Sequence, residues 1–261
     1  MTTLHRATAG LLSLAALAAV ALNLPGRARA DEAAFSPDQK AAIEKIVKDY
    51  LVANPEVLIE VQNILEAKME KAQAEKAKAA LADNAKEIFR SRQSPFAGKA
   101  DGDITVTEFF DYNCGYCKRS FPEVTKLISS DPKVRVVFKE MPILSKGSEE
   151  ASRVALAAKL QGKYWEVHQA LFENKGQNNE AVALKIAEKL GLDMTKLKAD
   201  MTGPEVNAEL KSARDLANKM GINGTPHFLV GDRSIAGAPD SLLSQLTTDI
   251  ADMRAAGCSY C

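Results

Sequence analysis

Residues 104–117, ITVTEFFDYNCGYC, decide the fold of this chain. The first seven are rich in β-branched and aromatic side chains, so they predict a strand. The residues after Cys117 have the spacing of a helix. Cys114 and Cys117 therefore stand between a strand and a helix, the setting in which two cysteines form a redox centre. Half of a zinc site is the alternative for an isolated pair of this spacing.

The first cysteine of the pair is expected to be the reactive one. A helix begins with unsatisfied N–H groups and the positive end of its dipole, so Cys114 should be a thiolate, with Cys117 as its resolving partner. The dipole contributes at most about 2 kcal/mol, and one pKa unit corresponds to about 1.36 kcal/mol. Hydrogen bonds within the loop must supply the rest. Gly115 and Tyr116 are therefore expected to tune the centre and to contact the substrate.

The N-terminus has the pattern of an export signal. Residues 1–30 hold an apolar run over 9–24 and end in a small-x-small site, Ala28-Arg29-Ala30. We predict a signal peptide over 1–30 and a mature protein that begins near Asp31 in the periplasm, where disulfides can form. Retention of the apolar run as a membrane anchor is the alternative.

The charge balance argues against nucleic acid as a partner. The chain has 34 basic and 34 acidic residues, and residues 1–30 hold three arginines and no acid. Removal of the signal therefore leaves a net charge of −3. A chain without a basic excess lacks the electrostatic signature of a nucleic-acid-binding protein.

Two helices are predicted between residues 36 and 69. Ser36 and Gln39 fit a capping box with Pro37 in the first turn, and Asn54-Pro55 ends the first helix and starts the second. Both helices carry an apolar stripe. The stripe consists of Ile43, Ile46, Tyr50, Val57, Leu58, Val61, Ile64, Leu65 and Met69. This part of the chain contributes no strands that could cover it.

A polar spacer follows the stripe. Between Met69 and Leu81 no side chain larger than alanine is apolar, and residues 70–78 resemble a semi-rigid helical spacer. We predict a helical linker over 70–95 and interpret 31–69 as a helical oligomerisation element, because an apolar hairpin held away from its domain buries best against copies of itself. The predicted homo-oligomer is a trimer in preference to a dimer, although fewer than four heptads do not separate the two. Folding of the stripe onto the rest of the chain is the alternative.

The remaining elements predict an α/β domain over residues 96–257. Two strands flank a helix that ends near residue 129, several helical patterns follow, and a hairpin and a last helix close the domain. The expected strands cover 104–110, 134–138, 227–230 and 234–236, the helical block covers about 146–220, and the last helix covers 240–255. This order predicts a thioredoxin fold that carries a helical insertion.

A proline before the third strand is expected to complete the site. Thr225-Pro226 follows a sharp glycine-rich turn, where a cis X-Pro bond is favoured. In a thioredoxin fold this loop faces the two cysteines, and the residue before the proline offers its backbone to an extended substrate. A trans proline without a role is the alternative.

Glu108 is the candidate proton carrier of the site. It lies within the strand that leads to the cysteines, and we expect it to pair with Lys139 after the second strand. Such a pair beneath Cys117 could accept and return the resolving thiol's proton. A structural ion pair or a surface glutamate is the alternative.

A second cysteine pair, Cys258 and Cys261, forms a tail over 258–261 with no helix after it. A local disulfide is the first interpretation, and capture of a soft metal such as Cu(I) is the second. His168 and His227 are expected to be packing or surface residues. No cofactor is expected.

These motifs together resemble the DsbA-like branch of the thioredoxin superfamily over about residues 104–255. The resemblance is carried by residues 109–117, FFDYNCGYC, and by Gly224-Thr225-Pro226. Gly115-Tyr116 with Thr225 is similar to the loops of disulfide isomerases of the DsbC type, and the N-terminal extension is similar to the suppressor of copper sensitivity group, ScsC. The resemblance implies an oligomer, substrates that are misoxidised or unfolded exported proteins, and a membrane thiol reductase of the DsbD/ScsB type as partner.

The sequence therefore predicts a periplasmic thiol–disulfide oxidoreductase with Cys114 as nucleophile. We expect an oligomeric protein disulfide isomerase, since such an enzyme attacks wrong disulfides as a thiolate. A dithiol oxidase of exported proteins and a copper-handling protein that uses Cys258 and Cys261 are the alternatives.

Overall fold

The computed structural model describes residues 35–258 and residue 260. The predicted signal peptide, its cleavage site and Cys261 lie outside the described residues. The chain divides into two compact units, with the boundary between Ile64 and Leu65.

The first unit holds helix α1 (Pro37–Ala53) and the start of α2 (Glu56–Phe89). The predicted capping box is present, because the Ser36 Oγ accepts the Gln39 N–H at 3.2 Å and the Gln39 Oε1 accepts the Ser36 N–H at 2.9 Å. Asn54 ends α1 with its backbone N–H on the Tyr50 carbonyl. The predicted helices and the break between them are thus confirmed.

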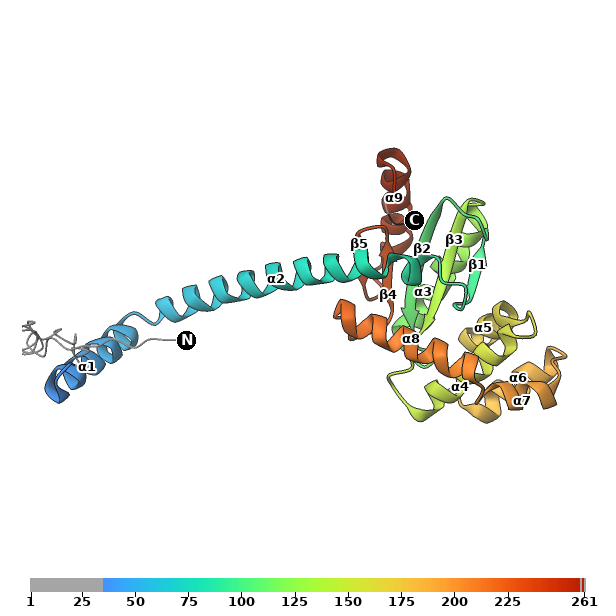
Figure 1. The fold of residues 1–261 in the computed structure, drawn as a ribbon, viewed down its shortest axis with the longest axis horizontal. Helices are drawn as coiled ribbons and strands as arrows, with labels where there is room; N and C mark the ends of the chain where they lie inside the picture. Colours follow the sequence, from blue (N-terminus) through green and yellow to red (C-terminus); the bar gives the residue numbers. More distant parts are fainter. Residues whose placement is uncertain (1–34, 259, 261) are drawn as a thin grey trace, which may run out of the picture. The chain divides into compact units, whose positions relative to one another are not determined.

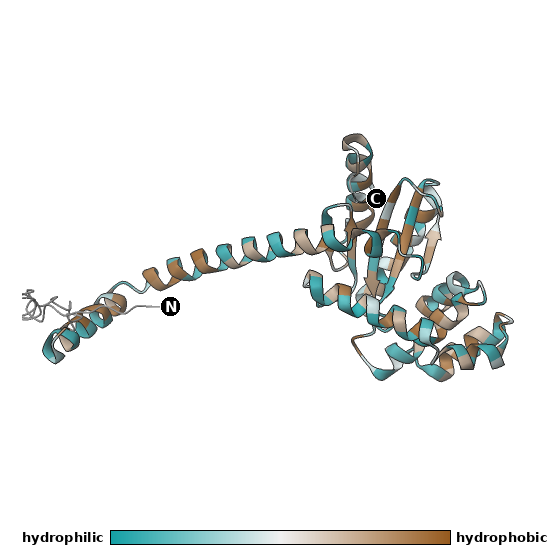
Figure 2. Ribbon diagram, viewed as in Figure 1, coloured by the Kyte–Doolittle hydropathy of each residue, from teal (hydrophilic) through white to brown (hydrophobic). Residues whose placement is uncertain are grey.

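The apolar stripe on these helices is exposed. No residue of α1 is buried. Val57 is half-buried, and the exposed fractions of the other stripe side chains run from 42% at Ile43 to 67% at Ile46. Figure 2 shows that apolar residues gather in the first turns of α2, whereas polar residues dominate its middle. An apolar surface of this kind indicates an interaction site.

The second unit is built on a five-stranded mixed sheet in the order β1-β3-β2-β4-β5 (Figure 1). Strands β3 and β2 are parallel to each other, and every other neighbouring pair is antiparallel. The bounds are β1 (Phe96–Gly98), β2 (Ile104–Phe110), β3 (Val134–Glu140), β4 (His227–Val230) and β5 (Arg233–Ala236). The sequence pattern missed β1, because three residues are too few to show alternation.

Helices cover both faces of this sheet. One core joins α3 and α9 to Val106 and Phe110 of β2, and the other joins the end of α2 and α8 to Phe109 and Leu229. The bounds are α3 (Gly115–Ser130), α4 (Lys146–Lys159), α5 (Tyr164–Glu173), α6 (Glu180–Lys189), α7 (Met194–Asp200), α8 (Pro204–Met220) and α9 (Leu242–Ala256). The predicted thioredoxin fold with a helical insertion is confirmed.

The spacer ends earlier than the predicted range 70–95. Leu81, Ile88 and Phe89 are buried in the second core, and the Thr107 hydroxyl donates to the Ile88 carbonyl at 2.9 Å. The last turns of α2 therefore belong to the thioredoxin-fold unit.

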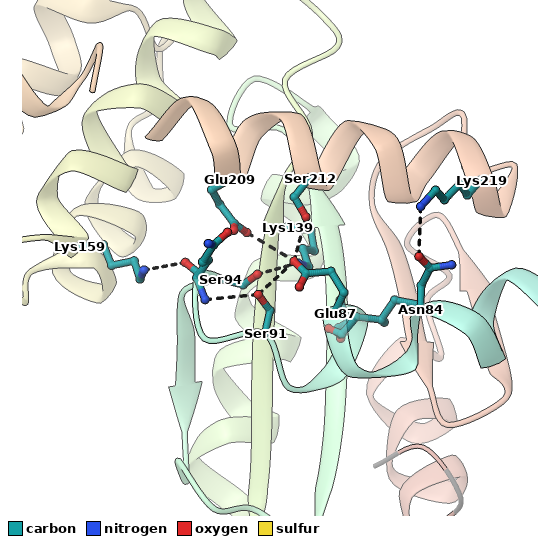
Figure 3. A network of polar contacts seen from close by, with 12 residues as sticks. Asn84, Glu87, Ser91, Ser94, Lys139, Lys159, Glu209, Ser212 and Lys219 are labelled. Atoms are coloured by element: carbon teal, nitrogen blue, oxygen red, sulfur yellow. Dashed lines mark hydrogen bonds and ion pairs between the residues drawn. The ribbon is translucent and has the colours of Figure 1, made fainter. Parts of the chain in front are cut away.

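A buried ionic network fastens these last turns to the sheet and to α8 (Figure 3). Lys139 is fully buried, and its Nζ donates to the Ser94 Oγ at 2.6 Å. It lies 3.4 Å from a Glu87 oxygen and 3.7 Å from a Glu209 oxygen. Burial raises the pKa of Glu87, but the charge of Lys139 and hydrogen bonds from Ser212, Ser91 and Lys139 outweigh it and lower that pKa.

Removal of the central cation tests this network. Lys139→Met leaves the buried carboxylate of Glu209 without its positive partner, so the free energy of unfolding should fall by about 3 kcal/mol. The matched control is Lys219→Met, which removes an exposed amine that donates to the Asn84 Oδ1 and should change the value by less than about 0.5 kcal/mol. Urea unfolding of both variants measures this. Equal stability of the two variants would contradict the assigned role of the network.

Candidate active site

The two cysteines of the sequence motif lie at the start of α3. Cys114 is the N-cap residue and Cys117 lies in the first turn, and both are free thiols. Cys117 is fully buried, whereas 6% of Cys114 is exposed. The site thus opens to solvent on the side of the first cysteine.

The cis-proline loop meets Cys114, as the sequence predicted. The Thr225-Pro226 bond is cis, and the Cys114 Sγ lies 3.2 Å from the Thr225 carbonyl oxygen. The Tyr116 side chain, two residues after Cys114, is 60% exposed, with the Arg119 guanidinium 4.9 Å from its ring centre. Cys114 therefore lies against Thr225 of the cis-proline loop.

The environment of Cys114 favours its ionised form. Its pKa is lowered to about 5. The largest cause is the hydrogen bond from the Cys117 thiol, which burial opposes, while the Thr225 side chain and the N–H groups of Cys117 and Tyr116 lower the pKa further. A helix N-terminus alone would provide a smaller shift. The thiol of Cys117 is therefore the main donor to the thiolate.

Cys117 has the opposite tendency. Burial raises its pKa, and the hydrogen bond to Cys114 and the charge of Glu108 raise it further. At neutral pH the first sulfur is thus a thiolate and the second a thiol. This division suits attack on a disulfide by Cys114 and resolution by Cys117.

Glu108 faces the cysteines without the cation that the sequence analysis assigned to it. It is 2% exposed, and its pKa is raised to about 8, first by burial and then by the charge of Cys114. With a pKa of about 8 this group is mostly protonated at neutral pH, and its ionised form is the one that can accept the proton that Cys117 must lose.

The predicted Glu108–Lys139 pair is wrong. Glu108 of β2 lies beside Phe138 of β3, whereas Lys139 lies beside Phe109. Since successive residues of a strand point to opposite faces of a sheet, the two charged side chains lie on opposite faces. Lys139 belongs to the network of Glu87, Ser94 and Glu209 in Figure 3.

A second buried carboxyl group near the site escaped the sequence analysis. The pKa of Glu140 is raised to about 8 by burial, and its oxygens accept hydrogen bonds from Tyr112, Tyr164 and Ser152 at 3.0, 2.9 and 2.7 Å. The Tyr112 hydroxyl also meets the His168 Nδ1 at 3.0 Å. The position of Glu140 at the end of a strand gave no sign of this cluster.

The two histidines have structural surroundings. His168 is buried among aromatic rings, with the Phe138 ring centre 4.4 Å away, and the His227 Nε2 lies 2.6 Å from the Ser234 Oγ. Within residues 35–258 and 260, no three His, Cys, Asp or Glu side chains gather as a metal site.

Of the two tail cysteines, the structure describes Cys258. It is disulfide-bonded, as the interpretation of the tail as a local disulfide requires. A Cβ atom added at Gly231 would lie 3.4 Å from its sulfur. Cys258 therefore lies near the turn of the β4–β5 hairpin.

A dithiol at the first turn of a helix, facing a cis-proline loop, defines a thiol–disulfide oxidoreductase of the thioredoxin fold. Comparison with protein families identifies the branch of the thioredoxin superfamily. The chain belongs to the DsbA-like thioredoxin domain family, whose model matches residues 105–247. The model of the N-terminal domain of the copper resistance protein ScsC matches residues 39–72. The resemblance found in the sequence is confirmed.

Three relatives show how far the similarity extends. A thioredoxin-like oxidoreductase from Silicibacter pomeroyi is 45% identical with a TM-score of 0.63, and the match covers 65% of this chain and 97% of that one. ScsC from Proteus mirabilis in a transitional conformation is 28% identical with a TM-score of 0.62, over 84% of this chain and 99% of that one. Disulfide bond formation protein D from Bacillus subtilis is 30% identical over 161 residues, which are 56% of this chain and 71% of that protein.

The same domain matches part of much longer proteins. The Na(+)/H(+) antiporter NhaA 3 of Salinispora tropica is 29% identical over 138 residues, which are 52% of this chain. This chain spans 21% of the length of that relative. Among the helices that the structure describes, none has the length and hydropathy needed to cross a bilayer.

The ionisation of Cys114 can be measured through its reactivity. The alkylation rate of the reduced protein should reach half of its maximum near pH 5, above which the thiolate dominates. Cys117→Ala removes the main hydrogen-bond donor, so this midpoint should rise by about one to two pH units. Iodoacetamide labelling followed by mass spectrometry measures both curves. An unchanged midpoint in the variant would contradict the role of the Cys117 thiol.

The proton acceptor role of Glu108 can be tested in the resolving step. In a mixed disulfide on Cys114, Glu108→Gln should slow the attack of Cys117 by roughly a hundredfold, the lower end of the usual contribution of a general base. Glu209→Gln is the matched control, because it changes a carboxyl group buried on the other face of the sheet. Rapid-quench kinetics of the released thiol reports the step. Equal rates in both variants would exclude Glu108 as the acceptor.

Proposed function

We propose that this chain is an exported protein disulfide isomerase that acts in the periplasm as a homo-oligomer. The Cys114 thiolate attacks one sulfur of a wrong disulfide, which forms a mixed disulfide and releases the other substrate sulfur as a thiolate. That thiolate then attacks another substrate disulfide, and rearrangement frees Cys114 with no net change of oxidation state. If rearrangement fails, Cys117 attacks the Cys114 sulfur, which releases reduced substrate and leaves the enzyme oxidised.

The exposed apolar stripe on α1 and the start of α2 carries this proposal. A dithiol centre is shared by oxidases, reductases and isomerases, whereas the stripe supports assembly of several centres in one particle. The match of residues 39–72 to the ScsC N-terminal domain coincides with this stripe. We favour a trimer over a dimer.

The spacer between stripe and domain supports handling of substrates of different shape. ScsC of Proteus mirabilis has been solved in a transitional and in a compact conformation. The spacer of this chain, residues 70–80, is polar and holds no apolar side chain larger than alanine. A solvated helix of this composition is able to bend.

The proposal fixes the partners by their chemistry. The substrates are misoxidised or unfolded exported proteins, and the signal peptide assigned to residues 1–30 would bring this chain to the compartment that holds them. Since the centre must stay reduced among oxidants, we assign its electrons to a membrane thiol reductase of the DsbD/ScsB type.

A dithiol oxidase is the second candidate, and the pKa of about 5 for Cys114 favours it. A strongly stabilised thiolate stabilises the reduced form and makes the disulfide a stronger oxidant. Equilibration with glutathione separates the two functions. A reduction potential near −120 mV, the value of a strong oxidase, would support the oxidase, whereas a clearly more reducing value supports the isomerase.

Copper handling through the tail cysteines is the third candidate. Residues 39–72 match the N-terminal domain of the copper resistance protein ScsC, and a reduced Cys258-Cys261 pair would suit Cu(I). Titration of the reduced protein with Cu(I) should show binding that is lost in a variant without both tail cysteines. Unchanged binding would exclude the tail as the copper site.

The isomerase proposal is tested by separating assembly from thiol chemistry. Val61→Lys with Leu65→Lys places two charges in the apolar stripe and should convert the oligomer to a monomer. The monomer should retain Cys114 alkylation but rescue scrambled ribonuclease at least about tenfold more slowly, since adjoining sites are lost. Asn63→Lys with Ala67→Lys adds the same charges on the other face of α2 and serves as control.

Light scattering gives the mass of each variant, and ribonuclease activity gives the rescue rate. An oligomer in the control and a monomer in the stripe variant are the expected masses. A stripe variant that is monomeric yet isomerises as fast as the unmodified protein would refute the role of assembly.

A further inference from the structure

The three residues before Cys114 set the position of its sulfur. Cys114 is itself the N-cap residue of α3, and no side chain caps the helix there. Its backbone N–H donates to the Asp111 carbonyl at 3.0 Å. The Asp111 carboxylate accepts the N–H groups of Asn113, Ile143 and Leu144 at 2.7, 2.9 and 3.0 Å. The path of residues 111–113 therefore decides where the sulfur lies.

A turn of the helical insertion is hydrogen-bonded to this segment. We call residues 174–179, between α5 and α6, the insertion turn. The Asn113 Oδ1 accepts the backbone N–H of Asn178 at 2.7 Å, and the Asn113 Nδ2 donates to the Asn178 carbonyl at 3.0 Å. The side chain of Asn113 thus pairs with the backbone of Asn178 as a neighbouring strand would.

The side chain of Asn178 in turn bonds to the backbone before Cys114. The Nδ2 of Asn178 donates to the Tyr112 carbonyl at 3.0 Å and to the Leu171 carbonyl at 3.1 Å, and its Oδ1 accepts the Asn174 Nδ2 at 3.0 Å. Asn178 is 1% exposed. A buried amide with all of these bonds formed holds one geometry, because loss of any bond leaves a polar group unsatisfied.

Two further contacts fix the insertion turn itself. The Lys118 Nζ, one residue after Cys117, donates to the carbonyls of Asn174 and Gly176 at 2.8 and 2.9 Å. On the other side Gly147 packs so closely that an added Cβ would lie 2.5 Å from the Asn178 carbonyl oxygen. The turn is therefore held by α3 and α4 as well as by α5.

We propose that Asn178 and Asn113 are positioning residues for the nucleophile, and that the insertion turn holds the Cys114 sulfur against the donors at the start of α3. The proposal rests on the function proposed for Cys114 above. It assigns the helical insertion a part in the reactivity of the dithiol, through bonds that reach residues 112 and 113 from a position more than sixty residues away along the chain.

The test uses three variants of the full chain in its reduced form. Asn178→Ala removes the bond to the Tyr112 carbonyl together with those to Leu171 and Asn174. Asn113→Ala removes the paired bonds to the Asn178 backbone and the bond from the Asn113 Nδ2 to the Ser148 Oγ at 3.1 Å. Asn179→Ala is the matched control: Asn179 lies in the same turn, but its side chain caps α6 by accepting the Val182 N–H at 3.0 Å. The readouts are the thermal unfolding midpoint, the pH dependence of Cys114 alkylation and the equilibrium constant with glutathione.

Each of the two positioning variants should move the alkylation midpoint up by about one pH unit, which is a tenfold loss of thiolate below the midpoint. The glutathione equilibrium should shift by a similar factor toward a less oxidising disulfide, because the reduced form loses stabilisation. Asn179→Ala should lower the thermal midpoint while its alkylation curve overlays that of the unmodified protein.

Folded variants of Asn178 and Asn113 that titrate like the unmodified protein would overturn the positioning role. If Asn178→Ala does not fold, Asn113→Ala decides alone, since Asn113 lies at the partly exposed rim of the site. A shift of the same size in Asn179→Ala would also overturn the proposal, because it would show that general loosening of the turn suffices. An unmodified protein with an ordinary thiol pKa at Cys114 would refute the proposed function instead.

Discussion

The chemistry of the site depends on one hydrogen bond between two sulfurs. The thiol of Cys117 donates to the thiolate of Cys114, and this contact is the largest cause of the lowered pKa of the first cysteine and one cause of the raised pKa of the second. Burial makes the division sharper, because it disfavours charge at Cys117 more than at the partly open Cys114. One helical turn thereby holds Cys114 as a thiolate nucleophile and Cys117 as a protonated thiol.

The sheet separates two kinds of buried charge. On the face of α3, Glu108 has no lysine beside it, and its pKa is raised to about 8. On the opposite face, Lys139 is surrounded by Glu87, Glu209 and Ser94 and joins the end of α2 to the domain (Figure 3). Glu108 and Lys139 lie on neighbouring strands, one residue apart in register, and each step along a strand changes the face. One face of the sheet therefore holds the thiol chemistry, and the other attaches the N-terminal helices.

Much of this arrangement follows from local patterns, and the exceptions share a physical cause. The strand, the dithiol turn, the capping box at Ser36 and the Thr225-Pro226 loop are written in short segments. The pairing of Glu108 with Lys139 failed because a face is set by the register between strands, and a shift of one residue reverses it. Asn178 and Glu140 escaped because their partners come from distant segments, which no spacing along the chain reveals.

The proposed thiol chemistry requires that Cys114 be ionised in the resting reduced protein. Because the pKa of Cys114 in the folded protein is below the ordinary thiol value, its ionisation stabilises the reduced folded protein fully at pH values above that ordinary value. This stabilisation is lost as the pH falls through the folded pKa. Titration of the thiolate by its ultraviolet absorbance measures this directly, with the oxidised protein as the reference. We predict one ionisation near pH 5. A single transition near the ordinary thiol pKa of about 8.5 would contradict the account.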